Sequence, residues 1–317
     1  MTDDDRRLFE DSLRKTIEQH SGEGLDAALD EFGWRDALVD DPELAVSSLF
    51  RLQGQANATS TALDDVLIAA LGLDVEASTA VVLSPMGQVD TPGSGRGGRL
   101  TVRGVATRRI EMCDNVVVIA ADGGAVVAVV VPRDVLSLRP IGGVDPHLHL
   151  VAVDGESALP SAGQPVSWGK AVAAGQVALG HELVGAATAM LQLAHDHAEQ
   201  RVQFGRPIAA FQAVRHRLAD ALVVSEAADA AVTAAWHDPS PLAAALAKAI
   251  GGRAAHTVGK HAQQVLGGMG FTSEHALHRY VRRTMALEQL LGDSRLLTKQ
   301  IGAEILRTRQ VPSMLPL

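Results

Sequence analysis

The stretch that decides the fold runs from residue 201 to residue 220 and reads RVQFGRPIAAFQAVRHRLAD. A long helical pattern ends at Arg201, in a turn where Gly205 is expected to stop the helix. The next helix is predicted to begin at Phe211 and Gln212. Arginine suits a pyrophosphate, because its planar fork donates two parallel hydrogen bonds to phosphate oxygens. Taken alone, Arg201 is better explained as a cation at a helix C-terminus, beside the negative end of the helix dipole.

A second segment, residues 264–271, reads QVLGGMGF and predicts a helix end that runs into a glycine-rich turn. Glycines adopt left-handed conformations and let a ligand approach the backbone closely. A plain helix cap before a loop explains this segment equally well. Each segment alone is therefore explained equally well or better by an ordinary helix end. A ligand-binding role is inferred only from the two segments together.

Length and composition limit the number of domains and the classes of function. A chain of 317 residues predicts two or three domains, and 47% hydrophobic with 21% charged residues is an ordinary globular mix. The net charge of −9 disfavours a nucleic-acid partner, and the single cysteine, Cys113, excludes an internal disulfide and a cysteine zinc cluster. The N-terminus lacks an apolar signal segment, and residues 116–131 predict two strands around a turn, not a membrane span. We expect a cytoplasmic protein with no membrane contact.

Three zones of different texture predict an α+β multidomain protein. Residues 1–75 show helical spacing of apolar side chains and predict a small helical N-terminal domain. Residues 76–165 carry short β-branched runs between Gly, Pro and Asp, which predict a small middle β domain, a barrel or sandwich. Residues 166–317 return to long helical patterns, and short links between four of them predict an antiparallel four-helix bundle whose last helix begins near Asp293.

The two glycine-bearing segments together resemble the signature of the acyl-CoA dehydrogenase family, a group of flavoenzymes. The resemblance implies the same order of helices, β domain and four-helix bundle. It also implies an FAD whose adenine and pyrophosphate end contacts both segments, while its flavin ring sits mainly in a neighbouring subunit. The N-terminal zone is shorter than is usual in the family, so this domain is expected to be truncated. Carried over by position, the cofactor contacts are Arg201, Gln203, Phe204, Gln264, Gly267 and Gly268.

Other patterns predict structure better than chemistry. Residues 93–98 match a dinucleotide-binding glycine pattern, but a β run follows them where a helix is needed, so a hairpin loop is expected. His147 and His149 alternate along a predicted strand, yet no third ligand is near, and we predict no metal site. His195 and His197 near a helix end are interpreted in the same way.

Three arginines, Arg279, Arg282 and Arg283, fall within about one helical turn. They could meet the phosphates of an acyl-CoA. A solvated helix face is the more usual explanation of such a cluster.

The base that the family uses is missing. In most members a glutamate just before the last helix removes the proton alpha to the thioester, and gap-free counting places Leu291 there. In other members the base lies on the first bundle helix, at the position of Gly175. Glu182 and Asp293 could be displaced bases, although an ordinary helix residue and a helix cap explain them better. The segment 83–87 lacks the acid and the loop that hold the flavin ring in the family.

These departures favour one subunit of a heteromeric FAD-dependent acyl-CoA dehydrogenase, inactive alone. A longer homologous partner would supply the ring pocket and the carboxylate, in an α2β2 tetramer acting on acyl-CoA. Among such enzymes the resemblance points to those that shorten steroid side chains. Two alternatives remain open: a non-catalytic scaffold that stabilises a dehydrogenase partner, and a self-sufficient homodimer that uses Glu182 or Asp293.

Overall fold

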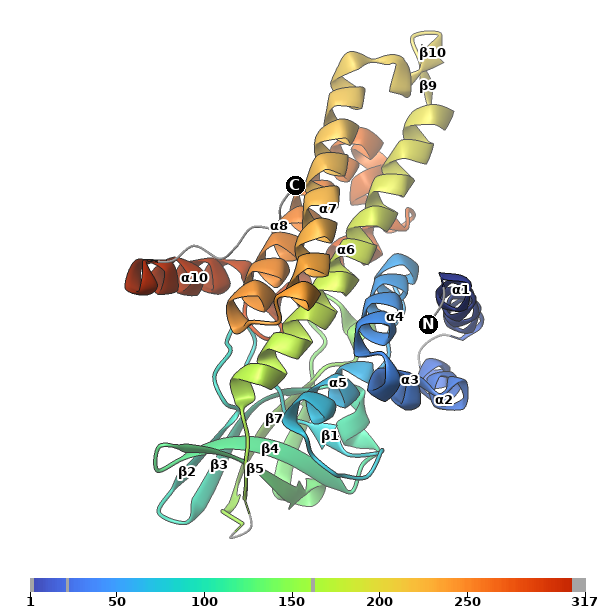
Figure 1. The fold of residues 1–317 in the computed structure, drawn as a ribbon. Helices are drawn as coiled ribbons and strands as arrows, with labels where there is room; N and C mark the ends of the chain where they lie inside the picture. Colours follow the sequence, from blue (N-terminus) through green and yellow to red (C-terminus); the bar gives the residue numbers. More distant parts are fainter. Residues whose placement is uncertain (1–2, 21–22, 161–162, 310–317) are drawn as a thin grey trace.

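The computed structural model describes residues 3–20, 23–160 and 163–309. Helices come first, a β-sheet follows, and long helices complete the chain (Figure 1). This order agrees with the three predicted zones, whose boundaries at 1–75, 76–165 and 166–317 stay predictions. Figure 1 shows the sheet at one end of the molecule and the long helices rising from it.

The N-terminal helices form a small layer against the first long helix. Their bounds are α1 Asp3–Gln19, α2 Glu23–Phe32, α3 Trp34–Asp40, α4 Pro42–Ala56 and α5 Ala62–Leu71. The Asp41 side chain caps α4 by accepting from Leu44 N, and Pro42 occupies the first helical position. Leu13 and Trp34 are fully buried, so the helical spacing in this zone records a real core.

The strands of the middle zone form one eight-stranded sheet. Their bounds are β1 Ala80–Val81, β2 Gly93–Arg96, β3 Arg99–Ala106, β4 Asn115–Asp122, β5 Ala125–Pro132, β6 Leu136–Pro140, β7 Val151–Ala158 and β8 Gln164–Pro165. The order is β6-β7-β3-β2-β4-β5-β8, and β1 pairs with β4 in parallel. The prediction of two strands within residues 116–131 is confirmed by the β4–β5 hairpin.

The glycine-rich segment before residue 99 is part of a second hairpin. Strand β2 pairs antiparallel with β3, and Gly97 and Gly98 have positive φ at the turn between them. This arrangement confirms that the segment is not a phosphate-binding loop before a helix.

Buried ion pairs join α5 to the sheet. Asp64 accepts hydrogen bonds from Val81 N at 2.8 Å and Thr107 Oγ1 at 2.6 Å. Asp65 holds the Arg109 guanidinium through two bonds of 2.7 and 2.9 Å. Burial raises the pKa of the Asp64 carboxyl to about 6, although the nearby positive charge of Arg109 lowers it. Because an unpaired charge is costly inside a protein, this network fixes the N-terminal helices on the sheet.

The long helices pack side by side and differ in one respect from the prediction. Their bounds are α6 Trp168–Gln200, α7 Gln212–His237, α8 Pro241–Leu266, α9 Leu277–Gln289 and α10 Ser294–Thr308. Helix α9, like α7, packs on both α6 and α8. The sequence analysis did not assign α9 as a separate helix. The helix after Asp293, α10, contacts α8 and projects sideways from the other helices (Figure 1).

Helix α6 is the central element of this region. It contacts α4, α5, α7, α8 and α9. By length and composition alone it could cross a membrane, but 72% of its most apolar window is buried inside the protein. Its apolar character is therefore that of a core helix.

Candidate functional site

The first family segment forms a tight hairpin at the tip of the long helices. Helix α6 ends at Gln200, and short strands β9 (Val202–Gln203) and β10 (Arg206–Pro207) pair across the turn. Phe204 and Gly205 both have positive φ, as a two-residue hairpin turn requires. The prediction that Gly205 stops the helix is wrong, since the glycine serves the hairpin that follows.

Phe204 is exposed in an unfavourable backbone conformation. Its side chain is 90% exposed, and its ring meets only the edge of Phe211, at 6.1 Å between centroids. The Arg206 guanidinium lies 4.4 Å from the centre of the Phe211 ring. A bulky residue with positive φ and an exposed ring is not explained by packing within this chain, and such outliers cluster at functional sites.

The second segment lies at the same end of the molecule. Gln264 is exposed on the last turn of α8, and Gly267–Phe271 form a 3₁₀ turn, which confirms the predicted helix end and glycine-rich turn. A side chain on Gly270 would collide with Gln263 O at 2.9 Å, so this glycine is required by close backbone packing. The turn leaves Phe271 73% exposed.

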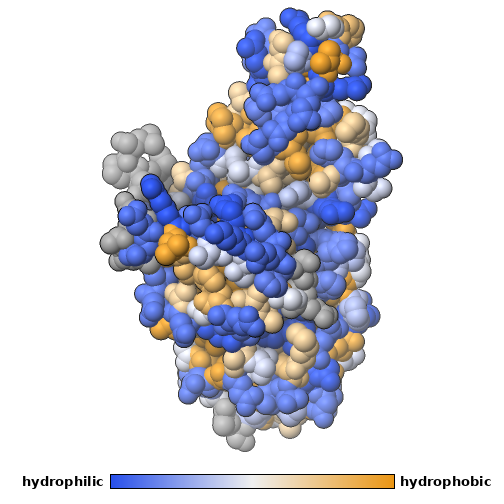
Figure 2. Space-filling model, turned by 90° about the vertical axis from the view of Figure 1, so that its right-hand side faces the viewer, coloured by the Kyte–Doolittle hydropathy of each residue, from blue (hydrophilic) through white to orange (hydrophobic). Residues whose placement is uncertain are grey.

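The two segments are neighbours in space. Helix α6, which ends in the first segment, packs along α8, which ends in the second. Burial, and then the charges of His275 and Arg201, lower the pKa of His197, so these side chains lie close together. Figure 2 shows hydrophobic side chains among hydrophilic ones at this upper tip. The tip therefore offers exposed aromatic, amide and arginine groups on one surface.

Leu291 and Gly175, the two positions predicted from the sequence to correspond to the family's base, are in contact. Leu291 is fully buried with positive φ, and its side chain fills the space over Gly175 so closely that a Cβ there would overlap Leu291 Cδ1. Gln176 Nε2 donates to Leu291 O at 2.9 Å and holds the loop in place. The space between these two residues is apolar and closed in this chain.

Asp293, the first displaced candidate, has a structural role. Its carboxylate accepts from Leu296 N at 2.6 Å and caps α10. Lys248 supports the same loop, because its buried Nζ donates to Glu288 O at 2.9 Å and Gly292 O at 2.7 Å. Burial lowers the pKa of Lys248 to about 8.

Glu182, the second candidate, lies in a buried network. Its side chain is 2% exposed, and burial raises its pKa to about 7 although Arg283 Nη1 lies 3.9 Å away. Arg283 pairs with Asp145 and donates to Thr59 Oγ1 at 2.8 Å. The suggestion that Arg283 belongs to a solvated face or meets CoA phosphates is therefore wrong.

No space for an acyl group adjoins Glu182. The cavity that it lines measures about 30 Å³, enough for about two water molecules. Helices α4 and α6 are in backbone contact beside it, since a Cβ on Gly54 would overlap Glu182 O and a Cβ on Gly185 would overlap Arg51 O. The geometry does not support Glu182 as a base for a substrate held between these helices.

The remaining sequence candidates take structural places. Ser84 donates to Asp90 O at 2.7 Å, and Gly87 N donates to Gln289 O at 2.7 Å, so residues 83–87 pack on the end of α9. The prediction that His147 and His149 share a strand is wrong, because a 3₁₀ turn, Pro146–Leu148, precedes His149 in a left-handed conformation. The described part of the chain contains no cluster of three metal-ligating side chains.

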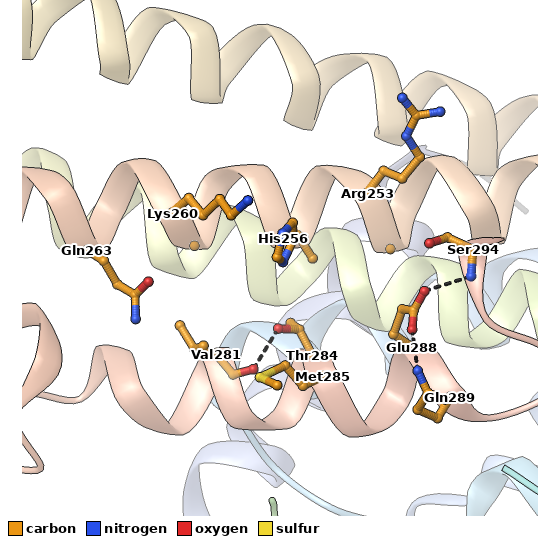
Figure 3. A pocket seen from close by; sticks show the side chains of 13 residues that line it. Arg253, His256, Lys260, Gln263, Val281, Thr284, Met285, Glu288, Gln289 and Ser294 are labelled. Carbon is orange, nitrogen blue, oxygen red and sulfur yellow. Dashed lines mark hydrogen bonds between the residues drawn. The ribbon is translucent and has the colours of Figure 1, made fainter. Parts of the chain in front are cut away.

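A larger cavity, with a volume of about 570 Å³, lies between α8 and α9 (Figure 3). The sequence analysis missed this groove, although Arg253, His256 and Lys260 recur on one face of α8 at helical spacing. This spacing of basic residues on one helix face is the sequence pattern from which the groove could have been predicted.

Comparisons with known proteins show which proteins the chain resembles. Residues 169–306 match the family profile "Acyl-CoA dehydrogenase, C-terminal domain". Acyl-CoA dehydrogenase IpdE2 of Mycobacterium tuberculosis (strain ATCC 25618 / H37Rv) is 37% identical over 169 residues, 53% of this chain and 52% of that protein. Acyl-CoA dehydrogenase FadE34 of the same organism is 45% identical over 123 residues, 37% of this chain and 17% of that protein. The chain spans about half of the length of these curated relatives, or less.

Solved structures share the fold. A variant of the Tcur3481-Tcur3483 steroid ACAD superimposes with a TM-score of 0.81 at 20% identity, over 96% of this chain and 99% of that one. The ChsE4-ChsE5 complex from Mycobacterium tuberculosis gives a TM-score of 0.78 at 20% identity, over 99% of both chains. Residues 169–306 therefore match the C-terminal domain of acyl-CoA dehydrogenases, and the chain as a whole shares its fold with these solved structures. FAD is the cofactor that this family implies.

Proposed function

We propose that this chain is one subunit of a heteromeric, FAD-dependent acyl-CoA dehydrogenase. Its hairpin tip and the turn after α8 bind the adenine and pyrophosphate end of an FAD. A longer homologous subunit supplies the flavin-ring pocket and the catalytic carboxylate. The observation that carries the proposal is the contact of Leu291 with Gly175, which closes both family positions of the base in this chain.

The residues at the tip fit one end of FAD and not the other. Arg201 can pair with phosphate oxygens, and the exposed Phe204 ring offers a surface on which an adenine can stack. Gln203 and Gln264 are exposed amides, and Gly267 and Gly268 leave room for close backbone approach, since no atom lies within 4 Å of a Cβ built on either. The segment 83–87 packs on α9 and presents no acid, so the ring end must be held by another chain.

The division of chemistry follows from this fit. When bound, FAD would supply the acceptor for the hydride that leaves the beta carbon of the acyl group. Removal of the alpha proton needs a carboxylate within hydrogen-bond distance, which contributes a factor of about 10² to 10⁴. Leu291 cannot take a proton, so the carboxylate of the partner performs that step. This chain binds and orients the nucleotide end of the cofactor.

A bulky, steroid-type acyl group is the substrate that the relatives favour. The Tcur3481-Tcur3483 protein is described as a steroid ACAD and superimposes on this chain with the TM-score given above. The seam between α4 and α6 is closed in this chain, so the acyl group has to be accommodated by the partner subunit.

Arg201→Ala tests the proposal against the scaffold alternative. In the complex with its longer homologue, the variant is expected to lose flavin absorbance and activity together, because a phosphate contact is removed. Arg206→Ala on the same hairpin is the matched control for effects of the turn itself. Unchanged flavin content and activity with Arg201→Ala would favour the non-catalytic scaffold.

Purification of the chain alone tests the homodimer alternative. We expect a colourless protein that does not oxidise acyl-CoA, since the described residues offer no free carboxylate at the family positions. A flavin-loaded, active preparation of this chain alone would contradict the proposal.

A further inference from the structure

A cavity of about 290 Å³ lies between the N-terminal helices and the long helices. Side chains of α1, α4, α6 and α7 line it, and Figure 1 shows α4 between α1 and α6. We call this cavity the His181 pocket, after the buried histidine of α6 that lines it. Its lining includes no residue of 201–220 or 264–271, so the FAD contacts of the proposed function do not use it. Its volume suits a small ligand.

His181 carries a buried N–H group without an acceptor. Its side chain is 1% exposed, and its Nε2 accepts from Trp236 Nε1 at 3.0 Å. Because an indole nitrogen only donates, Nε2 is unprotonated. Burial, and then the charge of Arg51, lower the pKa of His181 to about 4, so at neutral pH the ring has one proton, on Nδ1. Among the described residues this Nδ1 has no hydrogen-bond partner. Folded proteins rarely leave a buried donor unpaired, so an acceptor from outside the chain is expected there.

Arg51 of α4 adds further donors beside this ring. Within the described chain only its Nη2 is used, in an ion pair with Asp229 of α7, so Nε and Nη1 are free to donate. The charge of Arg51 lowers the pKa of His181 more strongly than the charge of Asp229 raises it, so the electrostatic potential at the ring is positive. Donors from two side chains under a positive potential suit an oxygen that carries negative charge.

Carboxylates also line the pocket, at its outer part. Glu10 and Glu43 are partly exposed, whereas His181 is buried. Of the charges on the described residues, only those of Arg51 and Asp229 shift the pKa of His181, so the two glutamates do not set the potential at the ring. The lining as a whole carries mixed charge, with three arginines and these two glutamates. The ligand is therefore specified by the donors at the buried end, not by net charge.

We propose that the His181 pocket binds a small oxyanion, a carboxylate or a phosphate group, through His181 and Arg51. One oxygen accepts from Nδ1 of His181, and a second oxygen accepts from Nε or Nη1 of Arg51. The Thr233 hydroxyl on α7 also lines the pocket, makes no hydrogen bond among the described residues, and can donate to the same group. The oxyanion connects α4, α6 and α7, so its binding stabilises the contact between the N-terminal helices and the long helices.

Titration of the full chain with acetate and, separately, with inorganic phosphate tests the inference. Both titrations are followed by calorimetry and by thermal unfolding, at constant pH and ionic strength. We expect at least one of the two anions to bind at one site per chain. The unfolding temperature should then rise by about 4 °C when that anion is present at one hundred times its Kd. The anion that binds more tightly identifies the group as a carboxylate or a phosphate.

His181→Gln removes the unpaired donor and keeps an acceptor for the indole. Its amide oxygen can still accept from Trp236 Nε1, but no N–H group replaces Nδ1–H of His181. Because a hydrogen bond to a charged group is lost, the Kd for the anion should rise at least about tenfold. The unfolding temperature of the variant without anion shows that it folds.

A second variant tests the same site from α4. Arg51→Gln/Asp229→Asn removes both members of the ion pair, so no lone charge remains, and it should also raise the Kd at least about tenfold. Arg99→Gln/Glu156→Gln, at the exposed ion pair between β3 and β7, is the matched control and should keep the wild-type Kd.

Three outcomes overturn the inference. The first is a wild-type chain that binds neither anion, which leaves a water molecule as the acceptor for His181. The second is a Kd that both variants leave unchanged. The third is an unfolding temperature that rises without saturation and equally in all four proteins, which is a general salt effect. Each of these outcomes leaves the proposed function intact, because flavin binding at the hairpin tip does not use this pocket.

Discussion

Leu291 fills the space above Gly175, two residues that lie more than one hundred positions apart in the chain. The gap-free counting of the sequence predicts that each stands where a branch of the family carries its catalytic glutamate. On that prediction, the two alternative positions of the base converge on one point in space. In this chain that point is filled by a leucine side chain with no solvent exposure.

A double-mutant cycle tests this contact. Gly175→Ala gains about 1 kcal/mol of helix propensity but forces its methyl group into Leu291, which costs about 1–3 kcal/mol, so a net loss is expected. Leu291→Ala alone should cost about 2–5 kcal/mol. In the Leu291→Ala background, Gly175→Ala should cost less than in the wild type, because the overlap with Leu291 is gone and the nearest remaining atom is Leu67 Cδ2 at 3.2 Å. Denaturant unfolding of the four proteins measures the sign, and additive free energies would contradict the contact.

Glu182 predicts a pH dependence of stability. Its pKa is about 7 when folded and 4.5 as a free side chain, so between these values the folded state keeps a proton that the unfolded state releases. Rising pH therefore lowers the free energy of unfolding through this window. Glu182→Gln has no such proton, and its stability relative to wild type should rise by roughly 3 kcal/mol between pH 5 and pH 8. A difference that is constant with pH would show that Glu182 is ionised in the fold.

Local chemistry explains which parts of the fold the sequence predicts. Ser240 before Pro241 starts α8, and the Ser240 side chain accepts from Ala243 N as an N-cap should. Asp293 caps α10 in the same way, and the turn at Gly97 and Gly98 closes a hairpin. Caps and turns are decided by neighbours in sequence, so these predictions were correct.

Long-range pairing explains the error at Arg283. Arg283 looks like a surface cation in sequence, but its partner Asp145 lies 138 positions earlier and draws it into the core. No periodicity in one segment records such a contact. The error at His149 has a local cause instead, because Asp145 accepts from His147 N and caps the turn Pro146–Leu148, a cap that the sequence analysis missed. The cofactor residues stay predictions, because their assignment depends on a chain that meets the tip from outside.

Asp293 allows a helix cap to be distinguished from a base. Asp293→Ala should lower the free energy of unfolding by about 1 kcal/mol, since the bond to Leu296 N is lost. Asn caps helices about as well as Asp, so Asp293→Asn should cost only a few tenths of a kcal/mol and leave the activity of the complex unchanged. Activity assays of both variants complexed with the longer homologue make the measurement. Loss of activity with Asp293→Asn, at full stability, would assign a catalytic role to the carboxylate.

Phe204 separates stability from cofactor binding. Glycine accepts positive φ without a penalty, whereas a side chain there costs about 1–2 kcal/mol. Because Phe204 is almost fully exposed, Phe204→Gly should keep the stability of the isolated chain or raise it by up to about 1 kcal/mol. The complex should nevertheless lose flavin, since the surface for the adenine is gone. Val39→Ala, at another exposed apolar position, is the control for both measurements. Full flavin content with Phe204→Gly would mean that the strained conformation serves something other than the cofactor.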